Sequence, residues 1–184
     1  YETTSLQGRG LQLNQGIHFF YSEIDKQFST SIETKHYFLF LHADSYLKKT
    51  DWKQFHIELS DTSPKLGSFR FATKKKGLIP SLYKVLVNLR CKFFSSPYGD
   101  QGYFICADYL KQHGLFLNMP IMEDVEWIQR KSTHPVFLSS ATLFTSSERF
   151  QKRGWIKSAF RNWKIYLKYR QGIDLKILAK HYYK

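Results

Sequence analysis

Two acidic positions, far apart in the chain, have the residue types that metal binding or proton transfer requires. The first is Asp44, which follows the apolar run of residues 37–41 and is preceded by His42 and Ala43. Because a carboxylate is costly to bury unless it is paired or bound to a cation, we expect a buried strand to end here and to present Asp44 at its carboxyl end. A carboxylate oxygen suits Mg²⁺ or Mn²⁺, which would in turn hold a diphosphate. Asp44 could instead cap the turn after the strand.

The second acidic position is the pair Glu123 and Asp124, at the start of an expected helix over residues 120–132. One of these carboxylates could act as a general base that removes a proton from an acceptor hydroxyl. Acidic residues in a first turn also interact favourably with the helix dipole, by about 0.3–1 kcal/mol each, which is a purely structural alternative. Glu126, one turn later, is expected to be solvated.

Three polar segments could complete a site. In "GRGLQLNQG", Arg9 could bind phosphate, and Gln12 and Asn14 could hydrogen-bond ribose or phosphate oxygens; a plain loop before a helix is the alternative. In "PYGDQG", Asp100 and Gln101 would project from a tight turn, which could equally be only a turn. The third segment, "SERFQKRGW", combines cations with an aromatic side chain and could be an anion clamp or the start of a solvated basic helix; its residues are Arg149, Lys152, Arg153 and Trp155.

Strands and helices that alternate along the chain must position these residues. We expect strands at residues 36–42, 66–73, 102–107 and 135–146, and helices at residues 8–24, 50–59, 78–94, 120–132 and 155–184. The alternation predicts an α/β class with a mostly parallel sheet, whose ligands lie beyond the carboxyl ends of the strands.

Three of these elements carry more detailed expectations. Thr50 is expected to cap the helix at residues 50–59. The alternation of Phe69 and Phe71 with polar residues predicts a half-buried strand. In the helix at residues 78–94 four apolar residues share one face: Leu82, Val85, Leu86 and Leu89.

Composition limits the class of protein and of partner. The chain has 184 residues, of which 42% are hydrophobic, which suits one globular domain. The net charge of +13 implies an anionic partner: nucleic acid, an acidic membrane surface or a phosphate-bearing substrate. The two cysteines, Cys91 and Cys106, lack metal-ligand spacing and are expected to be free thiols in a reducing, cytoplasmic compartment.

Taken together and in order, several segments resemble the family 2 glycosyltransferases, and among them a bacterial subgroup with a short catalytic domain. They are "GRGLQLNQG", "FLFLHADSYL", "GSFRF", "SSPYGDQGYFI", "NMPIMEDVEW" and "SSERFQKRGWIKSAFRNW". The resemblance runs from Gly8 to Tyr182. It implies a GT-A type fold, a Rossmann-like three-layer sandwich. It also implies inverting, metal-dependent transfer of a sugar from a nucleotide-sugar to a hydroxyl acceptor, with UDP-sugars as the preferred donors.

The resemblance also implies residue roles. Asp44, with His42 and Ala43, matches the DxD-type strand end and would bind Mn²⁺ or Mg²⁺ and the diphosphate. Asp124 would be the catalytic base, with Glu123 as second choice. The remaining matches are donor contacts at Arg9, Gln12 and Asn14, acceptor-side contacts at Asp100 and Gln101, and a phosphate clamp of Arg149, Arg153 and Trp155.

The resemblance extends to domain organisation and association. Family members begin with a strand of the type "SVVIPTLNE", which this sequence lacks, so residues 1–150 are expected to form a GT-A core without its first strands. Such a core would leave the donor pocket half built and the activity of this fragment in question. Exposed sheet edges favour a homo-oligomer or a complementing chain. Residues 151–184 are expected to form basic, aromatic helices packed on this core.

A rival prediction from another class is a non-catalytic basic module that binds nucleic acid or an anionic membrane surface. No RRM, OB or helix-turn-helix pattern is present, which disfavours nucleic acid. In "GWIKSAFRNWKIYLKYR", Trp155, Phe160 and Trp163 interleave with Lys and Arg. That pattern suits an interfacial helix at the inner face of the membrane and a lipid-linked acceptor, unless the aromatic side chains pack on the sheet.

Overall fold

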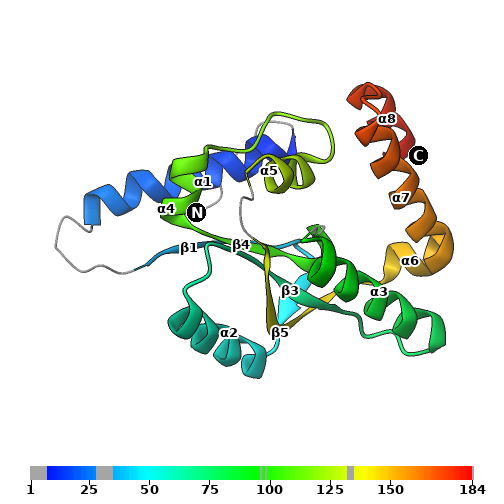
Figure 1. The fold of residues 1–184 in the computed structure, drawn as a ribbon, viewed down its shortest axis with the longest axis horizontal. Helices are drawn as coiled ribbons and strands as arrows, with labels where there is room; N and C mark the ends of the chain where they lie inside the picture. The colour runs from blue at the N-terminus through cyan, green and yellow to red at the C-terminus, as the bar shows by residue number, and fades with distance from the viewer. Residues whose placement is uncertain (1–7, 28–34, 96, 98, 132–134, 184) are drawn as a thin grey trace.

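The computed structural model describes residues 8–27, 35–95, 97, 99–131 and 135–183, which form a mixed α/β fold (Figure 1). The strands are β1 (Tyr37–Phe40), β2 (Ser45–Leu47), β3 (Leu66–Ala72), β4 (Tyr103–Cys106) and β5 (Phe137–Thr145). The helices are α1 (Arg9–Gln27), α2 (Lys49–Thr62), α3 (Leu78–Phe94), α4 (Ala107–His113), α5 (Glu123–Lys131), α6 (Glu148–Arg153), α7 (Trp155–Arg170) and α8 (Leu175–Tyr183), with a short 3-10 helix, η1, at Gly99–Gln101.

The five strands form one sheet in the order β1-β4-β3-β5-β2. Only the β3–β5 pair is parallel in the described sheet, and the other three pairs are antiparallel. The prediction of a mostly parallel sheet is therefore wrong. Alternation of strands and helices does not fix strand direction: α3 and η1 return the chain to the edge where β3 ends, so β4 runs opposite to β3.

Helices cover both faces of the sheet (Figure 1). Tyr103 and Ile105 of β4 point to the face under α1, α4 and α5, where they join a cluster that contains Trp127. Phe104, between them, points to the opposite face and packs against Phe55 of α2, with ring centroids 4.8 Å apart. Successive side chains of a strand point to opposite faces, so a strand this apolar is buried on both.

The central strand β3 is buried along almost its whole length. Of its seven residues only Arg70 is exposed, so the expectation of a half-buried strand is wrong. The reason is its position between β4 and β5, with helices on both faces: Ser68 lies 3.0 Å from the thiol of Cys91 in α3, and the next residue, Phe69, packs against Phe55 of α2 at 4.9 Å.

Helix α2 begins one residue before Thr50, so the prediction that Thr50 caps it is also wrong. Lys48 occupies the cap position and provides no side-chain hydrogen bond. The first turn is instead tied to the sheet, because the Asp51 carboxylate accepts a hydrogen bond of 2.9 Å from the backbone N–H of Thr142 in β5.

The C-terminal helices return to the body of the molecule. Ile165 of α7 and Leu178 of α8 are buried against Ile121, just before α5. Within the described residues, no helix combines the length and apolarity needed to cross a bilayer.

Candidate active site

The site is built at one edge of the sheet, where β1 and β5 end and β4 begins. After β1 the chain turns at His42–Ser45, closed by a 3.0 Å hydrogen bond from the N–H of Ser45 to the carbonyl of His42. This turn leaves the Asp44 side chain exposed at the rim of a pocket. The expected strand is present at Tyr37–Phe40, but it is a half-buried edge strand rather than a buried one, and Asp44 lies in the turn four residues beyond its end.

Thr145, the last residue of β5, fixes two loops of the site relative to each other. Its hydroxyl lies 2.9 Å from the Ser45 hydroxyl, next to Asp44, and donates a 2.9 Å hydrogen bond to the carbonyl of Asp100. One buried hydroxyl therefore positions both the turn after β1 and η1. This role of Thr145 does not follow from the sequence, because the pattern at the end of a strand does not show which loops the residue will contact.

Glu123 and Asp124 begin α5 and lie almost wholly buried, with 2% and 6% of their surface exposed. Asp124 accepts a 2.8 Å hydrogen bond from the N–H of Val125. Met122, directly before the helix, has φ of 66°, a left-handed conformation that is unfavourable for a side chain of this kind. This residue directly precedes the two carboxylates and lines the same pocket.

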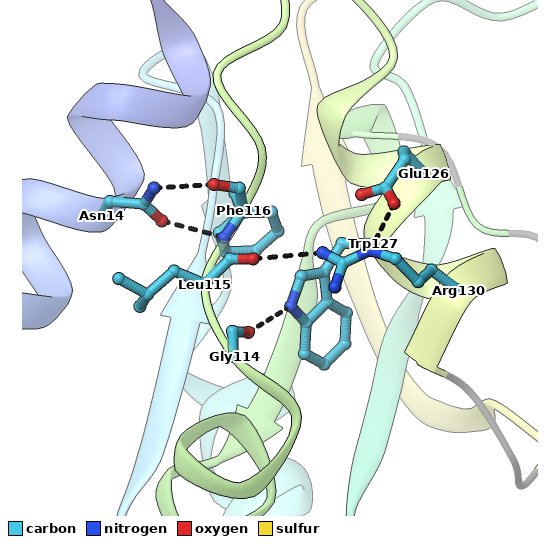
Figure 2. A network of polar contacts seen from close by, with 7 residues as sticks. All are labelled: Asn14, Gly114, Leu115, Phe116, Glu126, Trp127 and Arg130. Carbon is cyan, nitrogen blue, oxygen red and sulfur yellow. Dashed lines mark hydrogen bonds and ion pairs between the residues drawn. The ribbon is translucent and has the colours of Figure 1, made fainter.

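A polar network holds α5 against α1 and the segment between α4 and α5 (Figure 2). Asn14 of α1 both donates to and accepts from the backbone of Phe116, at 2.8 and 3.0 Å. On the α5 side, the indole N–H of Trp127 donates to the carbonyl of Gly114 at 2.8 Å, and Arg130 donates to that of Leu115 at 3.1 Å. Asn14 therefore acts on the site by positioning backbone.

Gly10 lets α1 approach close enough to deliver Arg9. A Cβ at this position would lie 2.5 Å from the carbonyl oxygen of Leu117, a separation that backbone atoms do not tolerate. The guanidinium of Arg9 then lies 3.1 Å from Glu123 and 3.5 Å from Asp124. One cation thus bridges both carboxylates, although 39% of its side chain is exposed to the pocket.

The electrostatics of this cluster combine burial with like charge. Burial raises the pKa of Glu123, the charge of Asp124 raises it further, and Arg9 opposes both. Burial is also the main cause of the raised pKa of Asp100, which Arg90 opposes and Asp124 reinforces. Such perturbed carboxyl groups in one cleft are typical of functional sites.

The pocket brings together seven of the predicted site residues. They are Arg9, His42, Asp44, Asp100, Glu123, Asp124 and Arg153. Asp44, from the turn after β1, and Asp124, from the start of α5, are far apart in the sequence and line the same cavity. The predicted roles of Asp44 and Asp124 require this convergence, since a leaving diphosphate and an attacking hydroxyl must lie close together.

The other predicted residues do not line this pocket. They are Gln12, Asn14, Ala43, Gln101, Lys152 and Trp155, while the Arg149 side chain lies outside the described part of the chain. Gln101 is fully buried, where it accepts a 2.9 Å hydrogen bond from Arg90 and donates to the carbonyl of Phe69. Trp155 stacks on Phe150 at 4.7 Å. Gln101 and Trp155 therefore stabilise the fold through these contacts.

Part of the pocket wall comes from α7 and α8, which the sequence predicted only as basic, aromatic helices packed on the core or at a membrane, with Trp155 in a phosphate clamp. This part of the wall contains Ser158, Arg161, Asn162 and Tyr182. The hydroxyl of Ser158 and the amide oxygen of Asn162 are buried and have no hydrogen-bond partner in the described structure, and the same holds for Oδ1 of Asp100. Buried polar atoms are nearly always paired, so such a group around one cavity points to a polar ligand.

The donor set can be tested against the implied divalent metal. No group of three His, Cys, Asp or Glu side chains stands ready to hold an ion in the described ranges. Mg²⁺, however, is commonly held by one or two carboxylates together with substrate phosphates rather than by a cage of protein ligands. Asp44, exposed at the rim with His42 beside it in the pocket lining, fits a metal shared with a phosphate-bearing ligand.

Comparison with protein-family models, with curated proteins and with solved structures finds no match to this chain.

Proposed function

We propose that the chain is a glycosyltransferase of the family 2 type with a GT-A related fold. It transfers a sugar with inversion from a nucleotide-sugar, preferably a UDP-sugar, to a hydroxyl acceptor. The observation that carries this proposal is the shared pocket of Asp44 and Asp124. Arg9, Arg153 and Arg161 add positive charge to the same walls, as a diphosphate ligand requires.

In this proposal Asp124 is the general base. Its carboxylate takes the proton from the acceptor hydroxyl as the hydroxyl oxygen attacks the anomeric carbon, and the bond from that carbon to the diphosphate breaks. Arg9 holds Asp124 in place through their 3.5 Å contact. A low exposure of 6% shields the carboxylate from bulk water.

The leaving diphosphate is stabilised at the other side of the pocket. Asp44 and His42 would hold the divalent metal, which supplies Lewis-acid stabilisation of the phosphate oxygens when bound. Arg153 of α6 and Arg161 of α7 line the pocket and provide further cationic contacts. Arg161 also lies over the ring of Tyr182, 5.4 Å from its centroid, which orients its guanidinium.

Calorimetric titration with UDP in the presence of Mn²⁺ tests this assignment. We expect metal-dependent binding to the wild-type chain and its loss in Asp44→Ala. The matched control is Asp61→Ala, which removes an exposed carboxylate outside the pocket and should bind as the wild type does. Equal binding by Asp44→Ala and the wild type would contradict the proposed metal ligand.

A further inference from the structure

Helix α3 exposes a continuous apolar stripe that the fold leaves uncovered. Seven residues form this outer stripe: Leu78, Ile79, Leu82, Val85, Leu86, Leu89 and Phe93. At 3.6 residues per turn they fall within about a third of the helix circumference. Their exposed fractions run from 42% for Leu89 to 86% for Leu78. A contiguous apolar surface of this kind marks a site of interaction with protein or membrane.

The opposite side of the same helix makes the contacts with the core. Pro80, Tyr83, Val87 and Cys91 are buried there. Tyr83 packs against Phe71 of β3 and against Trp155 of α7, at 5.7 and 5.4 Å. Because these contacts already fix α3, the outer stripe is not needed to attach the helix to the protein.

The surroundings of the outer stripe are strongly cationic. Between Asp61 and Asp100 the sequence contains eight Lys and Arg residues and no acidic residue. Three exposed lysines, residues 74–76, directly precede the helix, and Lys84 and Lys92 are exposed on it. The occupant of this surface should therefore be both apolar and anionic.

We propose that α3 is an interfacial helix that lies along the surface of a bilayer containing anionic lipid. Its 17 residues extend for about 25 Å, so the outer stripe can enter the boundary between headgroups and acyl chains along its whole length. Lysines 74–76, before the helix, and Lys92, beside the stripe, then contact lipid phosphates. This inference is independent of the proposed transferase activity, because none of the outer stripe residues lines the pocket.

A bilayer suits these observations better than a second copy of the chain. Pairing two outer stripes would bring lysines 74–76 and Lys92 of each copy close to cations of the other, and like charges at an interface are unfavourable. The stripe also projects from the surface of a helix, whereas a peptide or protein partner would need to supply a groove for it. An anionic bilayer meets both conditions.

The test is flotation of the full chain with lipid vesicles. Vesicles of phosphatidylcholine alone are compared with vesicles of phosphatidylcholine and phosphatidylglycerol in equal amounts. We expect the wild type to float with the anionic vesicles and to be released as salt is raised. The double variant Leu82→Glu/Leu86→Glu should partition at least about tenfold less, because it places charge in the centre of the outer stripe.

Ile57→Glu is the matched control, since Ile57 of α2 is 54% exposed, close to the 57% of Leu82 and the 55% of Leu86. It should float as the wild type does, and circular dichroism establishes that all variants are folded. Unchanged flotation of the double variant would overturn the proposal. Equal flotation with neutral vesicles would overturn its electrostatic part. A wild-type dimer in sedimentation velocity, lost in the double variant and without vesicle binding, would assign the stripe to a second copy instead.

Discussion

The pocket and the outer stripe of α3 depart from ordinary burial in opposite directions. In the pocket, Glu123 and Asp124 are almost fully buried, although charged groups belong in water. On α3, Leu78 and Phe93 are 86% and 70% exposed, although apolar side chains belong in the core. Each arrangement is unfavourable for the chain alone, and contacts with a second molecule would offset each.

The comparison teaches what kind of second molecule each region suits. The pocket has paired charges, directed hydrogen-bonding groups and a strained backbone at Met122, which are features of a site that recognises one small ligand. The outer stripe of α3 has apolar residues and nearby lysines without such directed geometry. This arrangement suits an extended, fluid surface such as a bilayer. Both departures lie where local sequence rules fail, and such failures are expected at functional positions.

The largest expected effect is a loss of turnover when the pocket is altered. Asp124→Asn keeps the shape of the side chain but cannot accept a proton. In an assay of nucleoside diphosphate release from UDP-sugars, we expect turnover to fall by about 10²–10⁴-fold while UDP binding stays close to that of the wild type. Glu126→Gln is the control, because Glu126 lies on the same helix, pairs with Arg130 and does not line the pocket. Near-normal turnover by Asp124→Asn would remove the base assignment.

The next largest effect is on stability, and it distinguishes the core-facing side of α3 from its outer stripe by substituting two neighbouring residues. Val87 is 4% exposed and Leu86 is 55% exposed. Val87→Ala opens a cavity in the core and should lower the free energy of unfolding by about 2 kcal/mol. Leu86→Ala should change it by no more than about 0.5 kcal/mol. Urea denaturation measures both, and equal losses would show that the outer stripe is packed after all.

Features of these regions that depend on local contacts could be predicted from the sequence, whereas features that depend on long-range contacts could not. The strand at Tyr37–Phe40 and the helix at Leu78–Phe94 follow from local pattern and were predicted within a few residues. Strand direction depends on where each connection re-enters the sheet, and the parallel prediction was therefore wrong. For α3 the pattern placed Leu82 and Leu86 on one face. It could not tell which side meets the core, because the helix is apolar on both.

The site divides in the same way. The acidic strand end and helix start identified Asp44 and Asp124, since both are marked by their immediate neighbours in the sequence. Thr145 and Ser158 were missed because their roles arise only when distant loops and helices meet. Gln101 shows the converse, since it stands next to Asp100 in the sequence and yet is turned into the core.

A smaller effect is expected in the pH dependence of stability, where a carboxylate in the pocket and one outside it should behave differently. The pKa of Glu123 is raised, mainly by burial, so its contribution to stability is present at low pH and lost as pH rises through that pKa. Burial also tends to raise the pKa of Glu58, but hydrogen bonds from Ser139 and Ser140 outweigh it and lower the pKa. The stability that Glu58 contributes is therefore present at neutral pH and lost on acidification.

The two glutamine variants should accordingly diverge. As pH rises from about 4 to neutrality, Tm of Glu123→Gln should increase relative to the wild type, whereas that of Glu58→Gln should decrease, each by a few degrees. Thermal melts across this range measure the difference. Parallel shifts of the two variants would mean that the pocket carboxylate sits in no special environment.

The central claim is that Asp44 and Asp124 serve one ligand in one pocket. Crystals of the chain grown with UDP and Mn²⁺ test it most directly, because anomalous scattering locates manganese without reference to the rest of the map. The account predicts an anomalous peak about 2.0–2.3 Å from an Asp44 oxygen, with the diphosphate between it and the start of α5. A nucleotide bound elsewhere, with manganese away from Asp44, would contradict it.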